Sequence, residues 1–342
     1  MNIVYHLTSA PPRIAETDAV FQEVEWLRAR FGGQTVNLFP LKHPTRLYPP
    51  CLYGLHAAAD LRALDAAADL HHVFHFTLYP FPVLKSLKRP VLYTVVAGLQ
   101  GQRRPASSAL AAIRHVVVSN ERDQRILQAW GIPQQGIDRH TLIRPGIDVA
   151  RFHPAPPEVG PGFRLLAGSA PWVRAQFRQK GIDALLEVVR RTPDLRLVLL
   201  WRGLLFDALM HRISQHGVAE RVEVINQRVD VDPLLARVHA AVVLAETPKI
   251  VKAYPHSLLE SLAAGKPVLV SEAIPMADYV RATGCGEVVE AVTPNALAGA
   301  IARLRAAYAQ RRASALQAGR RDFARERMLD AYGEVYRKSA GG

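Results

Sequence analysis

Short apolar runs alternate with segments of helical spacing along most of the chain, and this alternation restricts the fold more than any other feature. Residues 3–7 and 36–39 are apolar runs, and residues 16–31 between them repeat apolar side chains with the period of a helix. Further strands are predicted at 72–76, 91–96, 115–119 and 140–143, and helices at 55–68, 83–87, 107–113 and 123–130. Such repetition predicts an α/β domain with a mostly parallel sheet and helices on both faces.

A stretch rich in helix and strand breakers divides this pattern. Pro145-Gly146-Ile147-Asp148 and then Pro154-Ala155-Pro156-Pro157 predict an interdomain linker. The alternation restarts with strands predicted at 163–167, 196–201, 222–225, 240–245 and 267–270 and helices at 181–191, 204–216, 233–238, 257–264 and 275–283. From residue 294 onward the pattern is helical only, so we expect the last helix to pack back on the first domain. The predicted domains are 1–146 with 323–342, and 147–322, two similar lobes facing a cleft.

The chain carries a formal net charge of +13, which raises the question of a nucleic-acid partner. Residues 301–342 hold a disproportionate share of this excess, spread around an alanine-rich helical pattern. The aromatic interleaving of a stacking platform for single strands is missing there, so we expect no nucleic-acid partner. A solvated helix face and an anionic membrane surface both remain open.

Cysteine content and hydropathy point to the cytoplasm. The two cysteines, Cys51 and Cys285, lie in unlike contexts, which excludes a disulfide framework and a paired metal-ligand spacing. The N-terminus lacks a basic region before its apolar stretch, and no apolar run reaches the roughly 18 residues of a membrane span. We expect a cytoplasmic protein, with the inner face of the cell membrane as a second possibility.

Two common phosphate-binding motifs are missing. Ligands of parallel α/β sheets bind beyond the carboxyl ends of the strands, so the loops there are the place to look. Gly98-Leu99-Gln100-Gly101 has the wrong spacing for a dinucleotide turn, and Gly265-Lys266 is followed by Pro267 where a P-loop has Ser or Thr. The sequence therefore favours neither a dehydrogenase nor a P-loop enzyme.

The most informative window is residues 252–268. Pro255 ends a loop, Ser257 is a good helix N-cap, and Glu260 three residues later completes a capping-box pattern. The N-terminus of such a helix can bind a diphosphate, and Glu260 can accept hydrogen bonds from sugar hydroxyls. An ordinary capped helix would show the same pattern.

This window resembles the signature of the family-4 retaining glycosyltransferases of the GT-B fold. In that signature a Glu, a loop and a second Glu eight positions later precede a small-residue helix and a Gly-x-Pro-Val strand. Three further stretches agree in order within residues 65–290: Asp69-Leu70-His71-His72, Arg144-Pro145-Gly146-Ile147-Asp148 with Arg151-Phe152, and Lys180-Gly181-Ile182-Asp183.

The resemblance implies two Rossmann-like domains and a hexosyltransferase-type enzyme that moves a sugar with retention of anomeric configuration. The second domain would hold a nucleotide-diphosphate sugar, and the first would bind a glycan or lipid-linked acceptor through its hydroxyl. Such enzymes make glycans, glycolipids or polysaccharides and need no metal and no cofactor besides the donor. No side chain stands out as a covalent nucleophile, so front-face displacement is expected.

The resemblance also implies roles for single residues. Glu260 corresponds to a clamp on the nucleotide ribose, and Arg174 with Lys180 to the basic pair that stabilises the departing diphosphate. Arg178 is a spare candidate, and solvated surface charge is the alternative for these cations. The predicted catalytic residues are Arg174, Lys180 and Glu260. The predicted donor-binding residues are Arg174, Lys180, Arg228, Lys252, Tyr254, His256, Ser257, Leu258 and Glu260.

Three departures from the family pattern bear on activity. Lys252 stands where the family has its first Glu, and Val96 stands where a His often follows a Tyr-Thr-Val strand. The first loop, residues 9–17, lacks the usual glycine pair, and Arg13 or Thr17 would take over its role. A catalytically silent subunit that binds sugar nucleotides, or a scaffold, is therefore the alternative function.

Three histidines lie on one predicted strand. His71 and His75 share a face and His72 takes the other. Packing, a hydrogen-bonding role toward the acceptor, and a metal site are the alternatives, and a metal is disfavoured because convergent ligands are not visible. The predicted acceptor-side residues are Arg13, Thr17, His72 and His75, and no metal ligand is predicted. Cys285 is expected to be a small buried residue.

Overall fold

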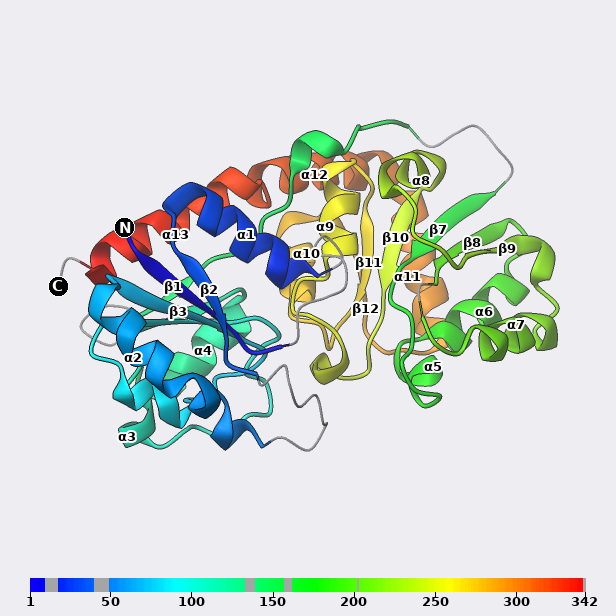
Figure 1. The fold of residues 1–342 in the computed structure, drawn as a ribbon. Coiled ribbons are helices and arrows are strands. Elements are labelled where there is room, and N and C mark those ends of the chain that lie inside the picture. Colours follow the sequence, from blue (N-terminus) through cyan, green and yellow to red (C-terminus); the bar gives the residue numbers. More distant parts are fainter. Residues whose placement is uncertain (10–17, 40–48, 133–138, 157–161, 202, 341–342) are drawn as a thin grey trace. The chain divides into compact units, whose positions relative to one another are not determined.

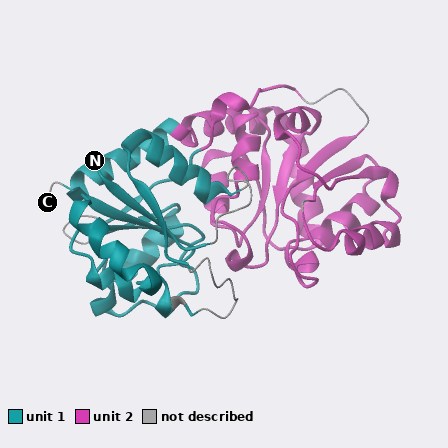
Figure 2. Cartoon of the chain, in the orientation of Figure 1, with its two compact units in different colours: residues 1–146, 326–342 teal, residues 147–325 magenta. Residues whose placement is uncertain are grey.

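The computed structural model describes residues 1–9, 18–39, 49–132, 139–156, 162–201 and 203–340 (Figure 1). The chain separates into two compact units (Figure 2). Unit 1 is Met1–Gly146 with Glu326–Gly342, and unit 2 is Ile147–Arg325. The domain boundaries predicted from the sequence follow residues 146 and 322, whereas in the structure residues 323–325 belong to unit 2.

Unit 1 is built on a parallel sheet with the strand order β2-β1-β3-β4-β5-β6. Its strands are β1 (Ile3–Leu7), β2 (Gln34–Asn37), β3 (Leu70–His75), β4 (Val91–Val95), β5 (His115–Val118) and β6 (Arg139–Leu142). The chain leaves β1 in one direction along the sheet to form β2 and then returns to form β3 on its other side. The carboxyl ends of β1 and β3 therefore meet at a topological switch point, where parallel sheets bind their ligands.

Helices cover both faces of this sheet. They are α1 (Ala19–Phe31), α2 (Ala58–Ala67), α3 (Ser107–Leu110), α4 (Glu121–Ala129) and α13 (Arg325–Ala340). Leu27 of α1 and Tyr336 of α13 pack with Tyr5 in one apolar cluster, while Leu61 of α2 and Leu127 of α4 pack in another. The prediction that the C-terminal helix packs back on the first domain is confirmed.

Unit 2 repeats this plan with the strand order β12-β11-β10-β7-β8-β9, again in parallel. Its strands are β7 (Phe163–Ala167), β8 (Leu195–Leu200), β9 (Val222–Ile225), β10 (Ala240–Val243), β11 (Val268–Ser271) and β12 (Gly286–Val289). Its helices are α5 (Gln176–Gln179), α6 (Ile182–Arg191), α7 (Phe206–Gln215), α8 (Val231–Arg237), α9 (His256–Ala263), α10 (Met276–Thr283), α11 (Pro294–Ala306) and α12 (Tyr308–Asp322). The switch point of this sheet lies between β7 and β10.

Three elements differ from the sequence expectation. Strand β12 was not predicted, because it is short and opens on a glycine. A Cβ on Gly286 would lie 2.0 Å from the Val268 carbonyl oxygen, so the close strand pairing excludes larger residues. The short helix α5 was also missed, and the predicted helix at 83–87 is a 3-10 turn over Pro82–Ser86.

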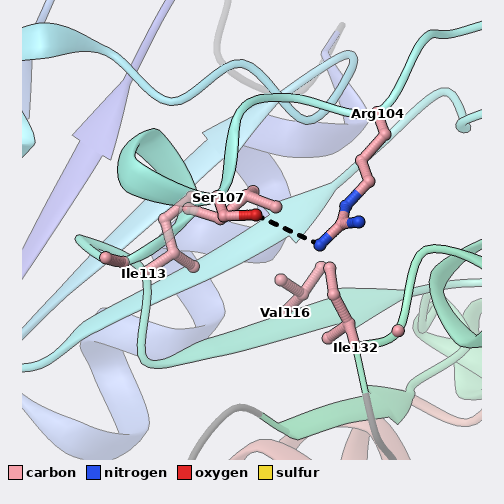
Figure 3. Close-up of a pocket in the computed structure, with 8 residues that line it drawn as sticks. Arg104, Ser107, Ile113, Val116 and Ile132 are labelled. Carbon is pink, nitrogen blue, oxygen red and sulfur yellow. Dashed lines mark hydrogen bonds between the residues drawn. The ribbon is translucent and has the colours of Figure 1, made fainter.

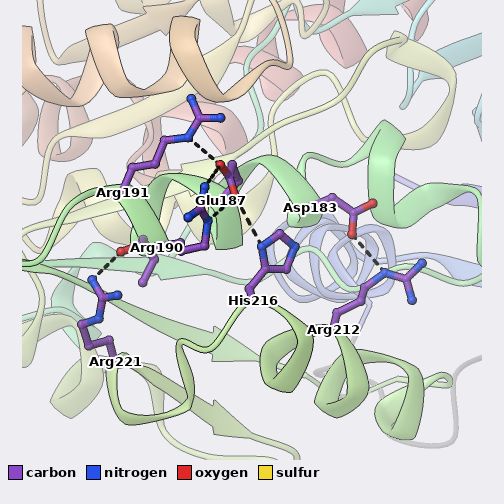
Figure 4. Close-up of polar contacts among 8 residues, drawn as sticks. Asp183, Glu187, Arg190, Arg191, Arg212, His216 and Arg221 are labelled. Carbon is purple, nitrogen blue, oxygen red and sulfur yellow. Dashed lines mark hydrogen bonds and ion pairs between the residues drawn. The ribbon is translucent and has the colours of Figure 1, made fainter.

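Charged side chains on α6 form hydrogen bonds within this helix and with α7 (Figure 4). Glu187 accepts hydrogen bonds from Arg190 and Arg191 on its own helix, and these bonds lower its pKa to about 2. Arg212 of α7 donates to Asp183 of α6 over 3.0 Å, which joins the two helices. This network stabilises the packing of α6 against α7, and the Arg212 guanidinium also lies 4.0 Å from the centroid of the Phe177 ring in α5.

Candidate functional site

The loops that follow β7 and β10 make up the candidate site of unit 2. These strands are neighbours at the switch point, so the segment after Ala167 and the segment after Val243 leave the sheet side by side. Arg174 and Lys180 lie on the first loop, and Lys252 with the start of α9 lies on the second. The structure thus brings most of the predicted donor-binding residues to one edge of one sheet.

Lys180 is the most unusual group at this edge. The residue is only 6% exposed, and its Nζ donates to the carbonyl oxygen of Ala170 over 3.1 Å. Within the described part of the chain no carboxylate pairs with this ammonium, and burial lowers its pKa below the usual value. A buried cation held by a single carbonyl is costly unless an anion joins it.

A second contact set ties the two loops together. The Arg178 guanidinium lies 2.6 Å from the Glu246 carboxylate, and the Glu246 backbone N–H donates to the Gln179 carbonyl over 2.8 Å. Gly181 has a φ of +68°, and a Cβ there would lie 2.6 Å from Leu244, so glycine lets the chain turn tightly behind Lys180. Arg178, the spare candidate, is therefore paired with Glu246, and Arg174 lies exposed on the same loop.

Helix α9 begins earlier than the capping-box pattern predicts. Pro255 is its N-cap, with extended backbone angles, and its carbonyl oxygen accepts from the N–H groups of Leu258 and Leu259. The prediction that Ser257 caps the helix is wrong: Ser257 lies inside the first turn, where its carbonyl oxygen accepts from the Ser261 hydroxyl. A proline fixes φ near the value that the N-cap needs here, so the helix starts directly after it.

The first turn of α9 faces the loop after β7. A Cβ built on Gly168 would lie 3.6 Å from the Ser257 Cβ. His256, Ser257 and Glu260 are half-buried and belong to this turn and the next. The N-terminus of α9 therefore lies beside the loop that carries Lys180, which is a suitable place for an anion.

Two predicted donor-binding side chains are part of the core instead. Tyr254 is 2% exposed and packs against the rings of Tyr279 and Phe323, and Leu258 is fully buried in the same cluster. Both side chains are packed in the core of unit 2, and the donor-binding role of these two residues stays a prediction. Arg228 follows β9, which is two strands away from β7 in the sheet.

Of the residues predicted for the acceptor, His72 is buried in unit 1, and its role stays a prediction. Its imidazole is 0% exposed and bonds the Tyr336 hydroxyl and the Thr94 hydroxyl, each over 2.7 Å, because its strand turns this face toward α13. His75 is half-buried at the end of β3 and bonds Thr8 over 2.8 Å. Arg13 and Thr17 lie outside the described residues.

His71 has a packing role. Its Nδ1 lies 2.8 Å from His6 Nε2, and its Nε2 lies 3.0 Å from the Asp65 carboxylate, all buried. Among the described ranges no group of three or more His, Cys, Asp or Glu side chains is placed to hold a metal ion. Cys285 is fully buried, as expected.

A small apolar pocket in unit 1 lies elsewhere (Figure 3). It has a volume of about 160 Å³, and its walls include Ile113, Val116 and Ile132, with Arg104 bonded to Ser107 over 3.2 Å. Ile113 precedes β5, so the pocket is near the amino end of this strand, away from the switch point.

No helix of the described residues is long and apolar enough to span a bilayer.

Three residues at these sheet edges were not predicted from the sequence: Gly168, Glu246 and Thr8. Glu246 follows a predicted strand directly, and Thr8 and Gly168 each follow the end of another strand. The rule that ligands bind at the carboxyl ends of strands would have found all three.

Comparison with known proteins links part of unit 2 to a described family. Residues 171–321 match the family model described as Glycosyl transferases group 1. No curated protein matches the chain. These matched residues cover less than half of the sequence and lie within unit 2.

Solved structures resemble the whole chain at low identity. Sucrose-phosphate synthase from Thermosynechococcus elongatus is 18% identical with a TM-score of 0.72, covering 99% of each chain. Anabaena Alr3699/HepE in complex with UDP is 15% identical with a TM-score of 0.75, covering 99% of this chain and 100% of its own. WaaG, a glycosyltransferase involved in lipopolysaccharide biosynthesis, is 16% identical with a TM-score of 0.67, covering 99% and 100%. The chain therefore has the GT-B fold, and the match of residues 171–321 to the glycosyl transferases group 1 supports its being a glycosyltransferase.

Proposed function

We propose that this chain transfers a sugar from a nucleotide-diphosphate donor to a hydroxyl group of a glycan or lipid-linked acceptor. The observation that carries the proposal is the buried Lys180 ammonium at the switch point of unit 2, where the described residues supply a carbonyl but no carboxylate. A diphosphate is the kind of anion that such a cation and the adjacent N-terminus of α9 would bind together.

The chemistry follows from charge. When the bond between sugar and phosphate breaks, negative charge grows on the departing diphosphate, and a fixed cation stabilises that charge. Lys180 would supply this cation from the protein interior, and Arg174 would supply a second one from the exposed part of the same loop. Two cations of this kind perform the task of a metal ion, so we propose a metal-independent, hexosyl-type transfer with retention, as in family 4.

The relatives fit this proposal. Anabaena Alr3699/HepE is known in complex with UDP and with UDP-glucose, which makes uridine nucleotides the first donors to test. WaaG acts in lipopolysaccharide biosynthesis, which is compatible with a cytoplasmic enzyme that builds a glycolipid or polysaccharide. Lys252 and Val96 keep a silent sugar-nucleotide-binding subunit as the second candidate.

Thermal unfolding in the presence of nucleotide sugars tests the proposal. A ligand that binds only the folded protein raises the midpoint, so UDP-glucose, UDP-N-acetylglucosamine, GDP-mannose and UDP-glucuronic acid should be compared with free UDP and GDP. Donors that stabilise the protein are then tested for turnover with candidate acceptors. Release of the nucleotide supports the transferase, stabilisation without any turnover supports the silent subunit, and no stabilisation by any of these compounds contradicts both.

Glu260→Gln should weaken nucleotide binding roughly 10-fold while leaving the rate of the bound complex nearly unchanged, the scale of one hydrogen bond to a charged group. A ribose contact is made equally before and during the reaction, so its loss raises the dissociation constant. Titration calorimetry with UDP measures this change. Glu334→Gln, an exposed carboxylate on α13, is the matched control. An unchanged UDP affinity for Glu260→Gln would show that this side chain serves its helix only.

Lys252→Ala should change donor selection. An ammonium at this position would pair with the carboxylate of a uronic-acid donor or act as a further cation on the diphosphate. In the first case the variant loses discrimination between UDP-glucuronic acid and UDP-glucose; in the second it slows transfer from both. Lys249→Ala, an exposed lysine of the same loop, is the control. Parent-like rates with both donors would exclude both roles.

Peripheral membrane association should be weak and salt-sensitive. The basic residues of α13 near the C-terminus would each contribute about 1 kcal/mol at an anionic surface. Co-sedimentation with vesicles of phosphatidylglycerol and phosphatidylcholine should therefore fall when salt is raised and in the double variant Arg337→Gln, Lys338→Gln, both exposed positions. Absence of binding at low salt would remove the membrane from the proposal.

A further inference from the structure

Thr8 and His75 occupy the switch point of the first sheet. Strand β1 ends at Leu7, which pairs with Phe74 of β3, so the next residues of the two strands lie opposite each other. The His75 carbonyl oxygen also accepts from the Val96 N–H over 2.9 Å, which fixes the backbone of His75 against the end of β4. The side chain is therefore held in place at the position where a parallel sheet binds its ligand.

The hydrogen bonds at Thr8 determine where His75 carries its proton. The Thr8 hydroxyl lies 2.8 Å from the Phe74 carbonyl oxygen, which can only accept, so the single hydroxyl hydrogen of Thr8 is used there. His75 Nδ1 lies 2.8 Å from the same hydroxyl oxygen. Because Thr8 has no second hydrogen to give, Nδ1 must carry one and donate it to Thr8.

A neutral imidazole with a hydrogen on Nδ1 has a lone pair on Nε2. Burial lowers the pKa of His75 to about 4, so the ring is neutral at pH 7. The rings of Phe76 and Phe81 stand edge-on to the imidazole, with centroids 6.1 and 5.0 Å away, and supply no hydrogen-bonding group. The residue is half-buried, and Nε2 has no hydrogen-bond partner among the described residues.

We propose that His75 Nε2 accepts a hydrogen bond from a hydroxyl group of the acceptor substrate, and that Thr8 is a positioning residue that fixes the tautomer. The lone pair suits a neutral O–H donor and repels a carboxylate or phosphate, so it selects an alcohol. The identity of this alcohol as the sugar acceptor rests on the proposed function, whereas the tautomer does not.

Nitrogen-15 NMR of histidine-labelled protein at pH 7 tests the tautomer without any activity. His75 should show a protonated Nδ1 and an unprotonated Nε2, with its signals assigned by their loss in His75→Asn. Thr8→Val removes the oxygen that accepts from Nδ1 and should move protonation toward Nε2, while Thr8→Ser should keep the parent pattern. A parent protein with the proton on Nε2 overturns the proposal whether or not the chain is an active transferase.

Kinetics test the contact itself, with the donor and acceptor found in the turnover screen. Asn at position 75 can still donate to Thr8 but has no atom where Nε2 lies, whereas Gln places an amide oxygen near that point. His75→Asn should therefore raise the KM for the acceptor roughly 10-fold, and His75→Gln should restore part of the loss.

The order of the two variants separates the alternatives. A residue that only supports Thr8 would tolerate Asn better than Gln, which contradicts the proposal. His56→Gln, an exposed histidine of unit 1, is the control and should behave like the parent protein. If no donor is turned over, the proposed function has failed and the tautomer measurement alone decides on His75.

Discussion

Lys180→Ala should slow sugar transfer by roughly 100-fold or more, the scale of losing one group that stabilises charge in the transition state. The diphosphate carries more charge as it departs than when it is bound as part of the donor, so the rate of the bound complex should fall more than the donor affinity. Steady-state kinetics with the best donor of the thermal screen measures both quantities.

The fold should survive this substitution. Lys180 contributes one hydrogen bond to a carbonyl, and its buried ammonium is a cost in the absence of a ligand, so its removal does not leave an unpaired charge behind. Lys180→Met keeps the length of the side chain and should be as slow as Lys180→Ala, with an unfolding midpoint at or above that of the parent. Lys85→Ala, an exposed lysine of unit 1, is the control. Parent-like turnover in Lys180→Met would contradict the role of Lys180.

The spacing of apolar residues predicted most strands and helices, because this spacing is a local property of the sequence. Most strands from β1 to β11 contain an apolar run, and the alternation with helices restricts the sheet to parallel order. The exceptions are β2 (Gln34–Asn37) and β6 (Arg139–Leu142), which are largely polar. Strand β12 was not predicted, because Gly286 and Glu287 interrupt the apolar run and the strand depends on its pairing with β11, which begins at Val268.

Burial, in contrast, depends on the whole fold, and here the sequence misled in both directions. A lysine is normally exposed, yet Lys180 is enclosed because the tight turn at Gly181 folds its loop over the sheet. A histidine and a tyrosine in a motif suggest binding residues, yet both are buried here. His72 contacts Tyr336 of α13, and Tyr254 packs against the Phe323 ring; both neighbours come from the C-terminal part of the sequence. Such long-range neighbours leave no trace in a local pattern.

The helix start at α9 failed for a different reason. Ser257 and Glu260 have the spacing of a capping box, but Pro255 precedes them and already has the conformation of an N-cap. Both Pro255 and Ser257 are compatible with a helix start, and the helix begins after the proline, whose φ is fixed. The N-terminus of α9 still lies at the switch point, so the binding of a diphosphate by this turn remains a prediction.

Unit 1 should lose stability steeply as the pH falls from 6.5 toward 4. His6, His71, His72 and His75 lie on β1 and β3, and burial lowers the pKa of each, to about 4 for His75 and well below 6.5 for His6 and His72. The unfolded chain takes up protons near pH 6.5 while the folded unit stays neutral. The stability is therefore complete above pH 6.5 and is lost as the pH falls toward the folded values.

The geometry gives a reason for these low pKa values. Asp65 accepts from His71 Nε2, His71 Nδ1 accepts from His6 Nε2, and His6 Nδ1 is buried with no hydrogen-bond partner among the described residues. A proton added to His6 Nδ1 would find no acceptor, so the chain of bonds is complete only in its neutral form. Burial raises the pKa of Asp123, which opposes the effect, but this is one group against four.

Each histidine contributes about 1.4 kcal/mol per pH unit below its unfolded pKa for as long as its folded form stays neutral. Hydrogen exchange of the amides in β1 and β3 at pH 7, 6 and 5, corrected for the intrinsic exchange rate, measures the free energy of opening of this unit. His72→Gln should reduce the slope, since it removes one proton from the balance. His56→Gln, exposed in the same unit, should leave the slope unchanged. Equal opening free energies at pH 7 and pH 5 in the parent protein would mean that these histidines do not stay neutral in the folded unit, and the neutral state that we assign to His75 would then lose its support as well.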